Sequence, residues 1–283
     1  MYNPVYTQAF YDAYGTREWS RLEATAYGRL QAIIHTDFIE RYLQSGDRVL
    51  DAGCGPGRFA VAIAQLGGRV TALDLSQQQL DLARERLAKA GLLDRAEGFV
   101  KGDVAQLSMC ADRQFDIVVA YGGALSYVCE QRHEAAAELA RVAKPGGHLL
   151  VSVMSRFGAA ASSVRRPFVP LLQDPDRWHL WRVVSEGDLP GFPSSSGMEH
   201  PPMHLYSAAE LQSLFTDVGC QVLEIAGSNV TAFEGSTGFE EIAADPKAWS
   251  TALDLERSLN RVPGLLDSGS HIILAARRHN STA

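Results

Sequence analysis

Residues 48–76, RVLDAGCGPGRFAVAIAQLGGRVTALDLS, decide the fold of this chain. The stretch reads as a short apolar strand, a glycine loop, a helix and a second strand that ends in an acid. Gly53, Gly55 and Gly57 supply turn geometry and let a ligand approach the backbone where a Cβ would clash. Asp74 follows Gly53 by twenty-one residues, a spacing at which its carboxylate can accept hydrogen bonds from both hydroxyls of a ribose. The pattern therefore predicts a crossover unit that holds a nucleoside cofactor.

The glycine loop differs from the G-x-G-x-x-G loop that binds the diphosphate of a dinucleotide. It reads DAGCGPG over residues 51–57, with the acidic Asp51 at the strand end and Pro56 inside the turn. These two residues suit a doubly negative diphosphate poorly, so an amino-acid-bearing nucleoside is the better fit. A nicotinamide oxidoreductase, which needs an open groove for a diphosphate, is the less favoured alternative.

The DAGCGPG loop resembles the first motif of class I S-adenosylmethionine-dependent methyltransferases. The resemblance implies S-adenosyl-L-methionine as the cofactor, with the loop around its methionine part and the acid of the second strand on its ribose. The residues of this part of the chain that we expect to contact the cofactor are Asp51, Gly53, Gly55, Gly57, Asp74 and Leu75.

A second motif of the same family is the sequence GDV at residues 102–104, which follows a strand-like stretch at 98–101. In the family, an acid at the position of Asp103 hydrogen-bonds the adenine amino group. The resemblance therefore implies that Asp103 and the adjacent Val104 lie at the adenine end of the cofactor site.

Two more stretches follow in the family order. The sequence FDIVV at residues 115–119 predicts a buried fourth strand that runs into Tyr121 and Gly122, two further candidate cofactor contacts. A Lys-Pro-Gly-Gly turn at residues 144–147 then precedes an apolar run that resembles the fifth strand. Four motifs in one order are strong evidence, whereas a lone glycine loop would be weak.

Strands alternate with helical patterns from residue 47 to residue 154, which is typical of a parallel sheet with helices on both faces. We therefore expect an α/β fold: a Rossmann-like, doubly wound, mostly parallel sheet of seven strands whose last strand is antiparallel, as the resemblance implies. The expected parts are an N-terminal helical lid at 1–46, a cofactor-binding core at 47–154, a substrate-cap insertion at 155–206, and the C-terminal part of the core at 207–283, with a helical insertion at about 233–268.

The lid supplies further candidate contacts with the cofactor. Residues 18–43 read as one helix with aromatic residues around it. A sulfonium cation beside an aromatic face gains roughly 0.5–2 kcal/mol, which makes Tyr14 and Trp19 candidates. Arg29 is a candidate partner for the cofactor carboxylate. Packing of the aromatic residues on the sheet, and an exposed helical position for the arginine, are equally good or better interpretations.

The cap supplies the candidate bases. An aliphatic hydroxyl or an ammonium acceptor must lose a proton, for which histidine is the usual base, whereas a carboxylate acceptor needs none. His204 is the first candidate base, His200 and His179 are the next, and Tyr127 or Tyr206 is a candidate for orienting the acceptor. Histidines without a distinctive partner spacing are more often structural than catalytic.

Local signals around the cap predict its boundaries. The run of proline, glycine and serine at residues 189–198 indicates a long loop over a pocket. Ser207 and Glu210 form a capping box, which predicts a helix at 208–218.

The composition limits the classes of partner that we expect for this chain. The formal net charge of -7 opposes long-range attraction to polyanions. The N-terminus has no basic start, and no run of some eighteen apolar residues occurs, so we expect a cytoplasmic protein that does not span a membrane. The four cysteines have no metal-ligand spacing, which favours buried free thiols, and we expect no metal site.

We therefore expect an S-adenosylmethionine-dependent methyltransferase that acts on an oxygen or nitrogen nucleophile of a small molecule. Residues 27–33 and 271–273 are also similar to bacterial methyltransferases that esterify a uridine-5-oxyacetic acid in tRNA, which makes tRNA an alternative partner. Residues 191–202, GFPSSSGMEHPP, lack the lysine run of those enzymes, so a nucleic-acid partner is the less favoured one. A module that senses the cofactor without methyl transfer is a second alternative, and a homodimer is left open.

Overall fold

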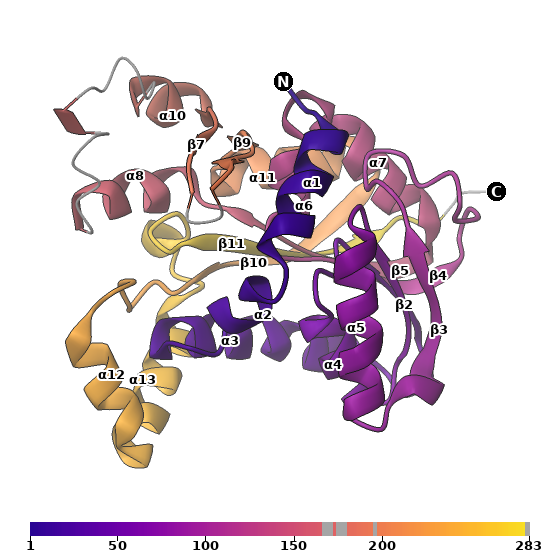
Figure 1. The fold of residues 1–283 in the computed structure, drawn as a ribbon, viewed down its shortest axis with the longest axis horizontal. Helices are drawn as coiled ribbons and strands as arrows, with labels where there is room; N and C mark the ends of the chain where they lie inside the picture. Colours follow the sequence, from indigo (N-terminus) through magenta and orange to yellow (C-terminus); the bar gives the residue numbers. More distant parts are fainter. Residues whose placement is uncertain (166–171, 174–179, 195–196, 281–283) are drawn as a thin grey trace.

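The computed structural model describes residues 1–165, 172–173, 180–194 and 197–280, so His179 lies outside the described residues. Seven strands form one sheet (Figure 1). In the order in which they lie side by side, the strands are β10 (Cys220–Ser228), β11 (His271–Arg278), β5 (Ala143–Met154), β4 (Phe115–Ala120), β1 (Arg48–Ala52), β2 (Arg69–Asp74) and β3 (Ala96–Lys101). The pairs from β5 to β3 are parallel, and β11 is antiparallel to both of its neighbours. The expected α/β class with an antiparallel last strand is confirmed.

The strand order reverses between β1 and β4. From β1 the chain continues outward to β2 and β3, whereas β4 and β5 lie on the other side of β1. In open α/β sheets, ligands bind at such a switch point, beyond the carboxyl ends of the strands. Gly53 follows β1 there, and Tyr121 follows β4. The topology therefore brings the first and third sequence motifs to one edge of the sheet.

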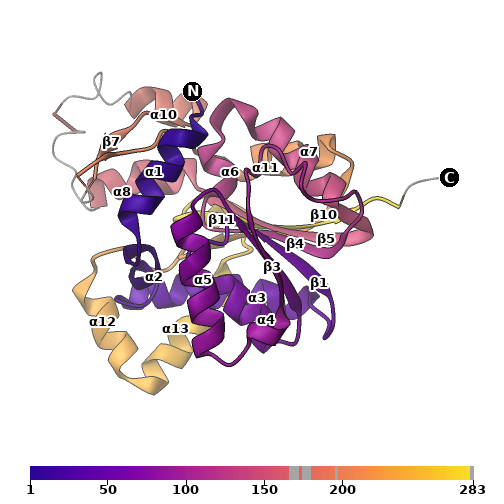
Figure 2. The ribbon, with the colours of Figure 1, turned by 45° about the vertical axis from the view of Figure 1, so that its right-hand side comes forward.

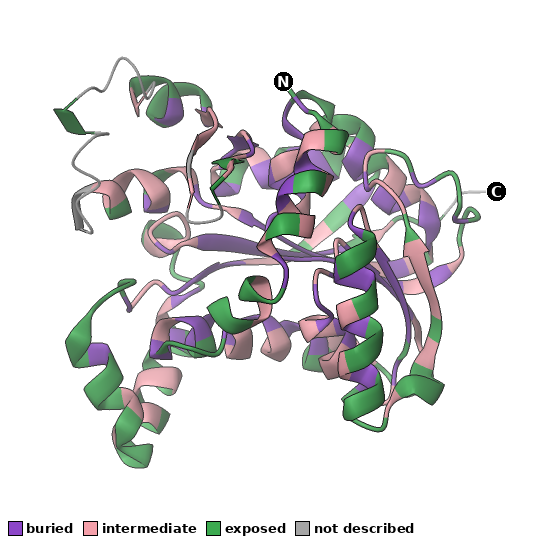
Figure 3. Ribbon diagram, in the orientation of Figure 1, coloured by how far each residue is buried: buried purple, intermediate pink, exposed green. Residues whose placement is uncertain are grey.

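Helices cover both faces of the sheet. The helices on one face are α3 (Ala26–Tyr42), α4 (Arg58–Gln65) and α5 (Gln77–Lys89), and those on the other are α7 (Arg132–Val142) and α11 (Ala208–Asp217). Successive strand residues point to opposite faces, so Val49 packs with α3 and α4 while Leu50 packs with α7 and α11. Figure 3 shows the result, buried strands between helices whose outer surfaces are exposed.

The lid consists of three helices rather than one helix at 18–43, so that prediction was wrong. Their bounds are α1 (Pro4–Tyr14), α2 (Arg17–Arg21) and α3. The chain turns after α2 because the Thr25 side chain accepts a hydrogen bond from Gly28 N at 3.0 Å and starts α3 afresh. A Cβ on Gly28 would meet the carbonyl oxygen of Arg21 at 2.5 Å, so only glycine permits this close turn. Asn3 caps α1, with Pro4 at its first turn.

The remaining elements lie around the carboxyl edge and at the ends of the sheet. They are α6 (Ala124–Tyr127), α8 (Arg156–Arg165), α10 (Leu180–Glu186), α12 (Thr237–Ala244), α13 (Pro246–Leu259), the 3-10 turns η1 (Leu93–Arg95), η2 (Cys129–Gln131) and η3 (Pro263–Leu265), and two ribbons, β6 (Asp188–Leu189) with β9 (Met203–His204) and β7 (Phe192–Pro193) with β8 (Glu199–His200). Figure 2 shows α8 and α10 above the β11 end of the sheet and α12 and α13 below it. The expected helix start is present, because the Ser207 side chain accepts from Glu210 N at the start of α11. The second half of the capping box is not formed, since the Glu210 carboxylate lies on Arg156 and His204 instead. No helix in the described ranges is both long and apolar enough to cross a membrane.

Candidate functional site

A cavity opens where the carboxyl ends of β1, β2 and β4 meet α1 and α2. We call it the sheet-edge cavity; it encloses about 950 Å³, its open mouth included. The residues expected at the cofactor that line it are Gly53, Gly55, Asp74, Leu75, Val104, Tyr121 and Gly122. Four loops that lie far apart in the sequence therefore share one hollow at the switch point of the sheet.

Two glycines of the first loop are required by geometry. Gly55 has a φ of +51°, a left-handed conformation, and its N–H donates to Asp74 Oδ2 at 2.8 Å. Gly57 has a φ of +86° and lies behind the cavity, where a Cβ would come within 2.8 Å of Ala83 on α5. Gly57 thus positions the start of α4 against α5, whereas Gly55 forms part of the cavity wall.

Asp74 lies at the centre of this wall. Its two carboxylate oxygens accept from Gly55 N at 2.8 Å and from Ser76 N at 2.9 Å. Burial raises the pKa of Asp74 to about 6, against the opposing effect of these two N–H groups. Each carboxylate oxygen has a second lone pair, so the side chain can accept two further hydrogen bonds from a vicinal diol.

Two other expected acids do not line the cavity. Asp51 is buried beneath the loop, accepts a backbone hydrogen bond from Ala60 on α4, and leaves its Oδ2 without a partner. Burial, with the charge of Asp74, raises the pKa of Asp51 to about 7. Asp103 accepts from Ala105 N at 2.8 Å and from the Tyr2 side chain. Asp51 therefore supports the loop from below, while Tyr2 lines the cavity where Asp103 was expected to do so.

Three residues that line the cavity carry polar atoms without a hydrogen-bond partner among the described residues. They are Arg58 Nε, His35 Nε2 and the Tyr121 hydroxyl, all buried. His35 Nδ1 lies 2.7 Å from the carbonyl oxygen of Gln31, which can only accept, so Nδ1 carries the proton and Nε2 a lone pair. Burial lowers the pKa of His35 to about 4, so its ring is neutral near pH 7. Unsatisfied buried groups of this kind indicate a place for a ligand.

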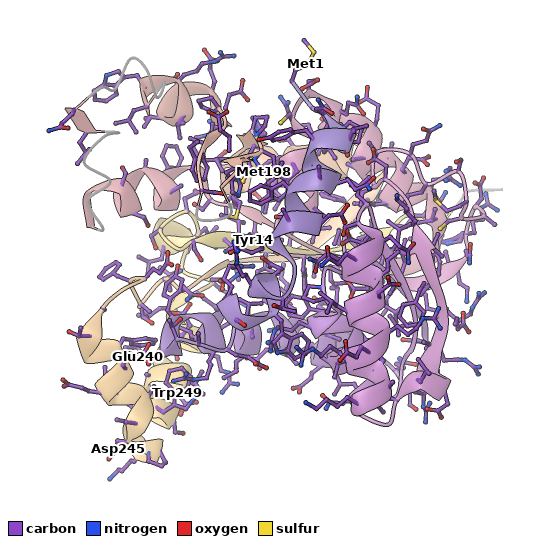
Figure 4. The ribbon with its side chains drawn as sticks, in the orientation of Figure 1. Met1, Tyr14, Met198, Glu240, Asp245 and Trp249 are labelled. Carbon is purple, nitrogen blue, oxygen red and sulfur yellow. The ribbon has the colours of Figure 1, made fainter. Side chains whose placement is uncertain are left out.

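The structure places three lid candidates away from this cavity. Arg29 is on the surface, where its Nη2 lies 3.6 Å from a carboxylate oxygen of Glu240. Trp19 packs against the guanidinium of Arg58 at 4.2 Å from the ring centroid, outside the cavity lining. Tyr14 stacks on Phe10 at the C-terminal end of α1, where Figure 4 labels it. The cationic residues that do line the cavity are Arg21 and Arg58, which the sequence analysis did not single out.

A second hollow adjoins the first between α1, α2, α6 and the β7–β8 ribbon. We call it the aromatic cavity; it also encloses about 950 Å³ with its mouth. The residues that line both cavities are Tyr11, Glu18, Arg21, Gly122 and Tyr127. Of the candidate catalytic residues, Tyr127 and His200 lie here, with the Tyr127 hydroxyl 3.2 Å from His200 Nε2.

His204 lies elsewhere, and its position does not support the expected role as a base. Its side chain is 2 % exposed and lines neither cavity. Its Nδ1 lies 2.9 Å from Asp188 Oδ1, and its Nε2 lies 2.6 Å from Glu210 Oε1. Because both ring nitrogens are engaged by carboxylates, the residue ties the β6–β9 ribbon to α11 and has no nitrogen left for an acceptor.

Comparisons with known proteins agree with this geometry. Residues 49–147 match the family described as a methyltransferase domain. The chain is 36% identical over 129 residues to a malonyl-[acyl-carrier protein] O-methyltransferase of Serratia marcescens, covering 44% of this chain and 47% of that protein. It is 29% identical over 220 residues to the methyltransferase GfsG of Streptomyces halstedii, covering 75% and 71%. The chain spans about half the length of the first of these relatives.

Among solved structures, the chain resembles the magnesium protoporphyrin IX methyltransferase ChlM from Synechocystis PCC 6803, which was solved with bound SAH. The TM-score is 0.60 with 16% sequence identity, over 97% of this chain and 99% of that one. At this identity the likeness concerns the fold.

Proposed function

We propose that this chain, whose residues 49–147 form a class I S-adenosylmethionine-dependent methyltransferase domain, transfers a methyl group to an oxygen or nitrogen atom of a small molecule. The observation that carries the proposal is the shared wall of the two cavities, at Tyr11, Gly122 and Tyr127 among others. A cofactor in the sheet-edge cavity and an acceptor in the aromatic cavity would meet there.

The residues of the sheet-edge cavity fit this cofactor. Asp74 offers two free lone pairs to a ribose diol. Among the other residues that line the cavity, Arg58 Nε offers a donor for a carboxylate, and His35 Nε2 offers an acceptor for an ammonium group, neither with a partner among the described residues. A Cβ on Gly122 would meet nothing within 4 Å, so the wall has open space at the junction. These atoms complement the ribose and the two charged groups of an amino-acid-bearing nucleoside.

When bound, S-adenosyl-L-methionine supplies a methyl group attached to a sulfonium, and its transfer leaves a neutral thioether. The chain contributes alignment and exclusion of water, since positioning alone can supply effective molarities of about 10⁵–10⁸ M. Helices α1 and α2 cover the junction from one side, while Gly122 and Tyr127 close it from the sheet side. A sensor that binds the cofactor without methyl transfer has no need of a second hollow at this point.

The test is a pair of glycine substitutions. Gly122→Ala and Gly91→Ala carry similar strain, with φ of +75° and +71°, and neither new Cβ meets an atom within 4 Å. Only Gly122 lies at the junction. Formation of S-adenosylhomocysteine, measured with a panel of phenol, amine and carboxylate acceptors and a tRNA control, is expected to fall about 10²-fold or more in Gly122→Ala and to stay near wild type in Gly91→Ala. Equal activities of the two variants, or methylation of tRNA alone, would overturn the proposal.

A further inference from the structure

The aromatic cavity contains a pair of charges that already balance each other. Arg21 Nε and Nη2 donate to the two carboxylate oxygens of Glu18 at 2.7–3.3 Å. Among the described residues that line this cavity, they are the one guanidinium and the one carboxylate. Because Glu18 already offsets the charge of Arg21, an incoming carboxylate would add an unbalanced negative charge to a pair that is neutral overall. The charge balance therefore favours an uncharged occupant.

Flat side chains form much of the wall of this cavity. Phe10 and Tyr14 stack with ring centroids 5.6 Å apart and planes 15° apart. Phe192 stacks on His200 at 4.4 Å and 10°. Aromatic pairs gain about 0.5–1.5 kcal/mol beyond the burial of their area, and two methionine thioethers complete the lining with adaptable apolar surface. The walls therefore suit an occupant with a flat, largely apolar body.

A chain of hydrogen bonds leads from the junction into the protein. His200 Nδ1 lies 2.9 Å from the carbonyl oxygen of Pro201, which can only accept, so Nδ1 carries the proton and Nε2 has the lone pair. The Tyr127 hydroxyl, 3.2 Å away, donates to that lone pair, and the Tyr11 side chain donates to Tyr127. Burial lowers the pKa of His200, so its ring is neutral near pH 7 and able to take a proton.

We infer that the methyl acceptor is an uncharged compound with a flat, largely apolar body and a hydroxyl group, and that Tyr127 and His200 form the route by which the hydroxyl loses its proton. The inference rests on the proposed function and specifies the acceptor class of the same site. Tyr127 lines the junction and acts on the acceptor directly, whereas His200 acts through Tyr127. Carboxylate acceptors, which need no base, are disfavoured by the Glu18–Arg21 pair.

The proposed methyl transfer balances in protons and electrons. The acceptor oxygen forms a bond to the methyl carbon, and the C–S bond breaks with its electron pair left on the departing thioether. The hydroxyl proton passes to the oxygen of Tyr127 while Tyr127 passes its own proton to His200 Nε2. The products are a methyl ether, a neutral tyrosine and an imidazolium, which the water at the cavity mouth then deprotonates.

The test compares two probes of equal shape, 2-naphthol and 2-naphthoate, on protein saturated with S-adenosylhomocysteine. Calorimetric titration is expected to give at least tenfold tighter binding of the naphthol. Glu18→Gln, which frees Arg21, is expected to improve naphthoate binding about tenfold. Absence of naphthol binding, or naphthoate binding equal to or tighter than naphthol binding in the wild type, would overturn the inference.

The proton route has a spectroscopic readout that does not depend on turnover. An excited naphthol is a stronger acid and emits as the naphtholate when a base is within reach. We expect naphtholate emission from the bound probe to fall at least fivefold in Tyr127→Phe and His200→Asn, and to persist in His133→Asn, whose histidine is exposed on α7. Unchanged emission in His200→Asn would contradict the route. Failure of S-adenosylhomocysteine itself to bind would count against the proposed function instead, so the two failures can be told apart.

Discussion

Asp74→Asn tests the cofactor site most sharply, because it removes one charge while it preserves size. The carboxylate already accepts from Gly55 N and Ser76 N and would accept two hydroxyls from a bound ribose. Hydrogen bonds to a charged group contribute about 1.5–3 kcal/mol, and each 1.4 kcal/mol is tenfold in affinity. We therefore expect the affinity for S-adenosylhomocysteine to fall roughly 10- to 150-fold. Asp81→Asn, the same change at an exposed position on α5, is expected to leave the affinity unchanged.

The pH dependence gives this prediction a second, independent part. The pKa of Asp74 is about 6, and the charged form is the one that accepts from the ribose. Wild-type affinity is therefore expected to be constant above this pKa and to fall up to tenfold per pH unit below it. The affinity of the Asn variant is not expected to fall through the titration of residue 74. The variant still contains Asp51, whose pKa in the wild type is about 7, so titration of Asp51 affects both proteins. Calorimetry from pH 5 to pH 8 on both proteins measures this pH dependence of the affinity. Equal affinities of wild type and Asp74→Asn at pH 8 would refute the assignment.

Three further substitutions separate structural from binding roles. His204→Asn is expected to lower the free energy of unfolding by about 1–3 kcal/mol, because Asp188 and Glu210 each lose one of their partners, with cofactor affinity unchanged; lost turnover without lost stability would support a base instead. Gly57→Ala should lower the melting temperature more than Gly219→Ala, which has a similar φ but an open environment, and equal losses would contradict the close contact with α5. Arg58→Met should weaken S-adenosylhomocysteine binding about tenfold or more, while Arg84→Met, another arginine stacked on a ring, should not; equal affinities would exclude Arg58 from the site.

The sheet and the glycine loop were predictable because their signals are local. The strand ends, the turn glycines and the acid at position 74 are all fixed within one crossover unit, and the topology then determines which loops meet. The N-cap at Ser207 likewise depends on four consecutive residues. Each of these features depends on short-range geometry that the sequence carries directly.

The N-terminal helices were less predictable because the orientation of α2 relative to α3 depends on one turn. The helical stretch is interrupted between α2 and α3, and Gly28 in the first turn of α3 packs on the backbone of Arg21. That turn points Arg21 into the cavity and leaves Arg29 on the surface with Glu240. A glycine near the start of a helical stretch was the available signal, but its partner could not be known without the tertiary contact.

The choice between the cap histidines also depended on tertiary pairing. His200 and His204 are four residues apart, yet one belongs to the β7–β8 ribbon and the other to the β6–β9 ribbon. The first faces the aromatic cavity, and the second is buried between two carboxylates. His35 was overlooked for a related reason: it is a polar residue one turn after Gln31 on the buried face of α3, a pattern that marks a site only once the cavity beside it is known.

Calorimetric titration of the purified protein with S-adenosylhomocysteine, and separately with NADH, tests the central claim most directly. The geometry of the sheet-edge cavity predicts one binding site per chain for S-adenosylhomocysteine, in the micromolar range, and no binding of NADH. Binding of NADH without S-adenosylhomocysteine would contradict the assignment of the cavity, and with it the roles given to Asp74, Arg58 and His35.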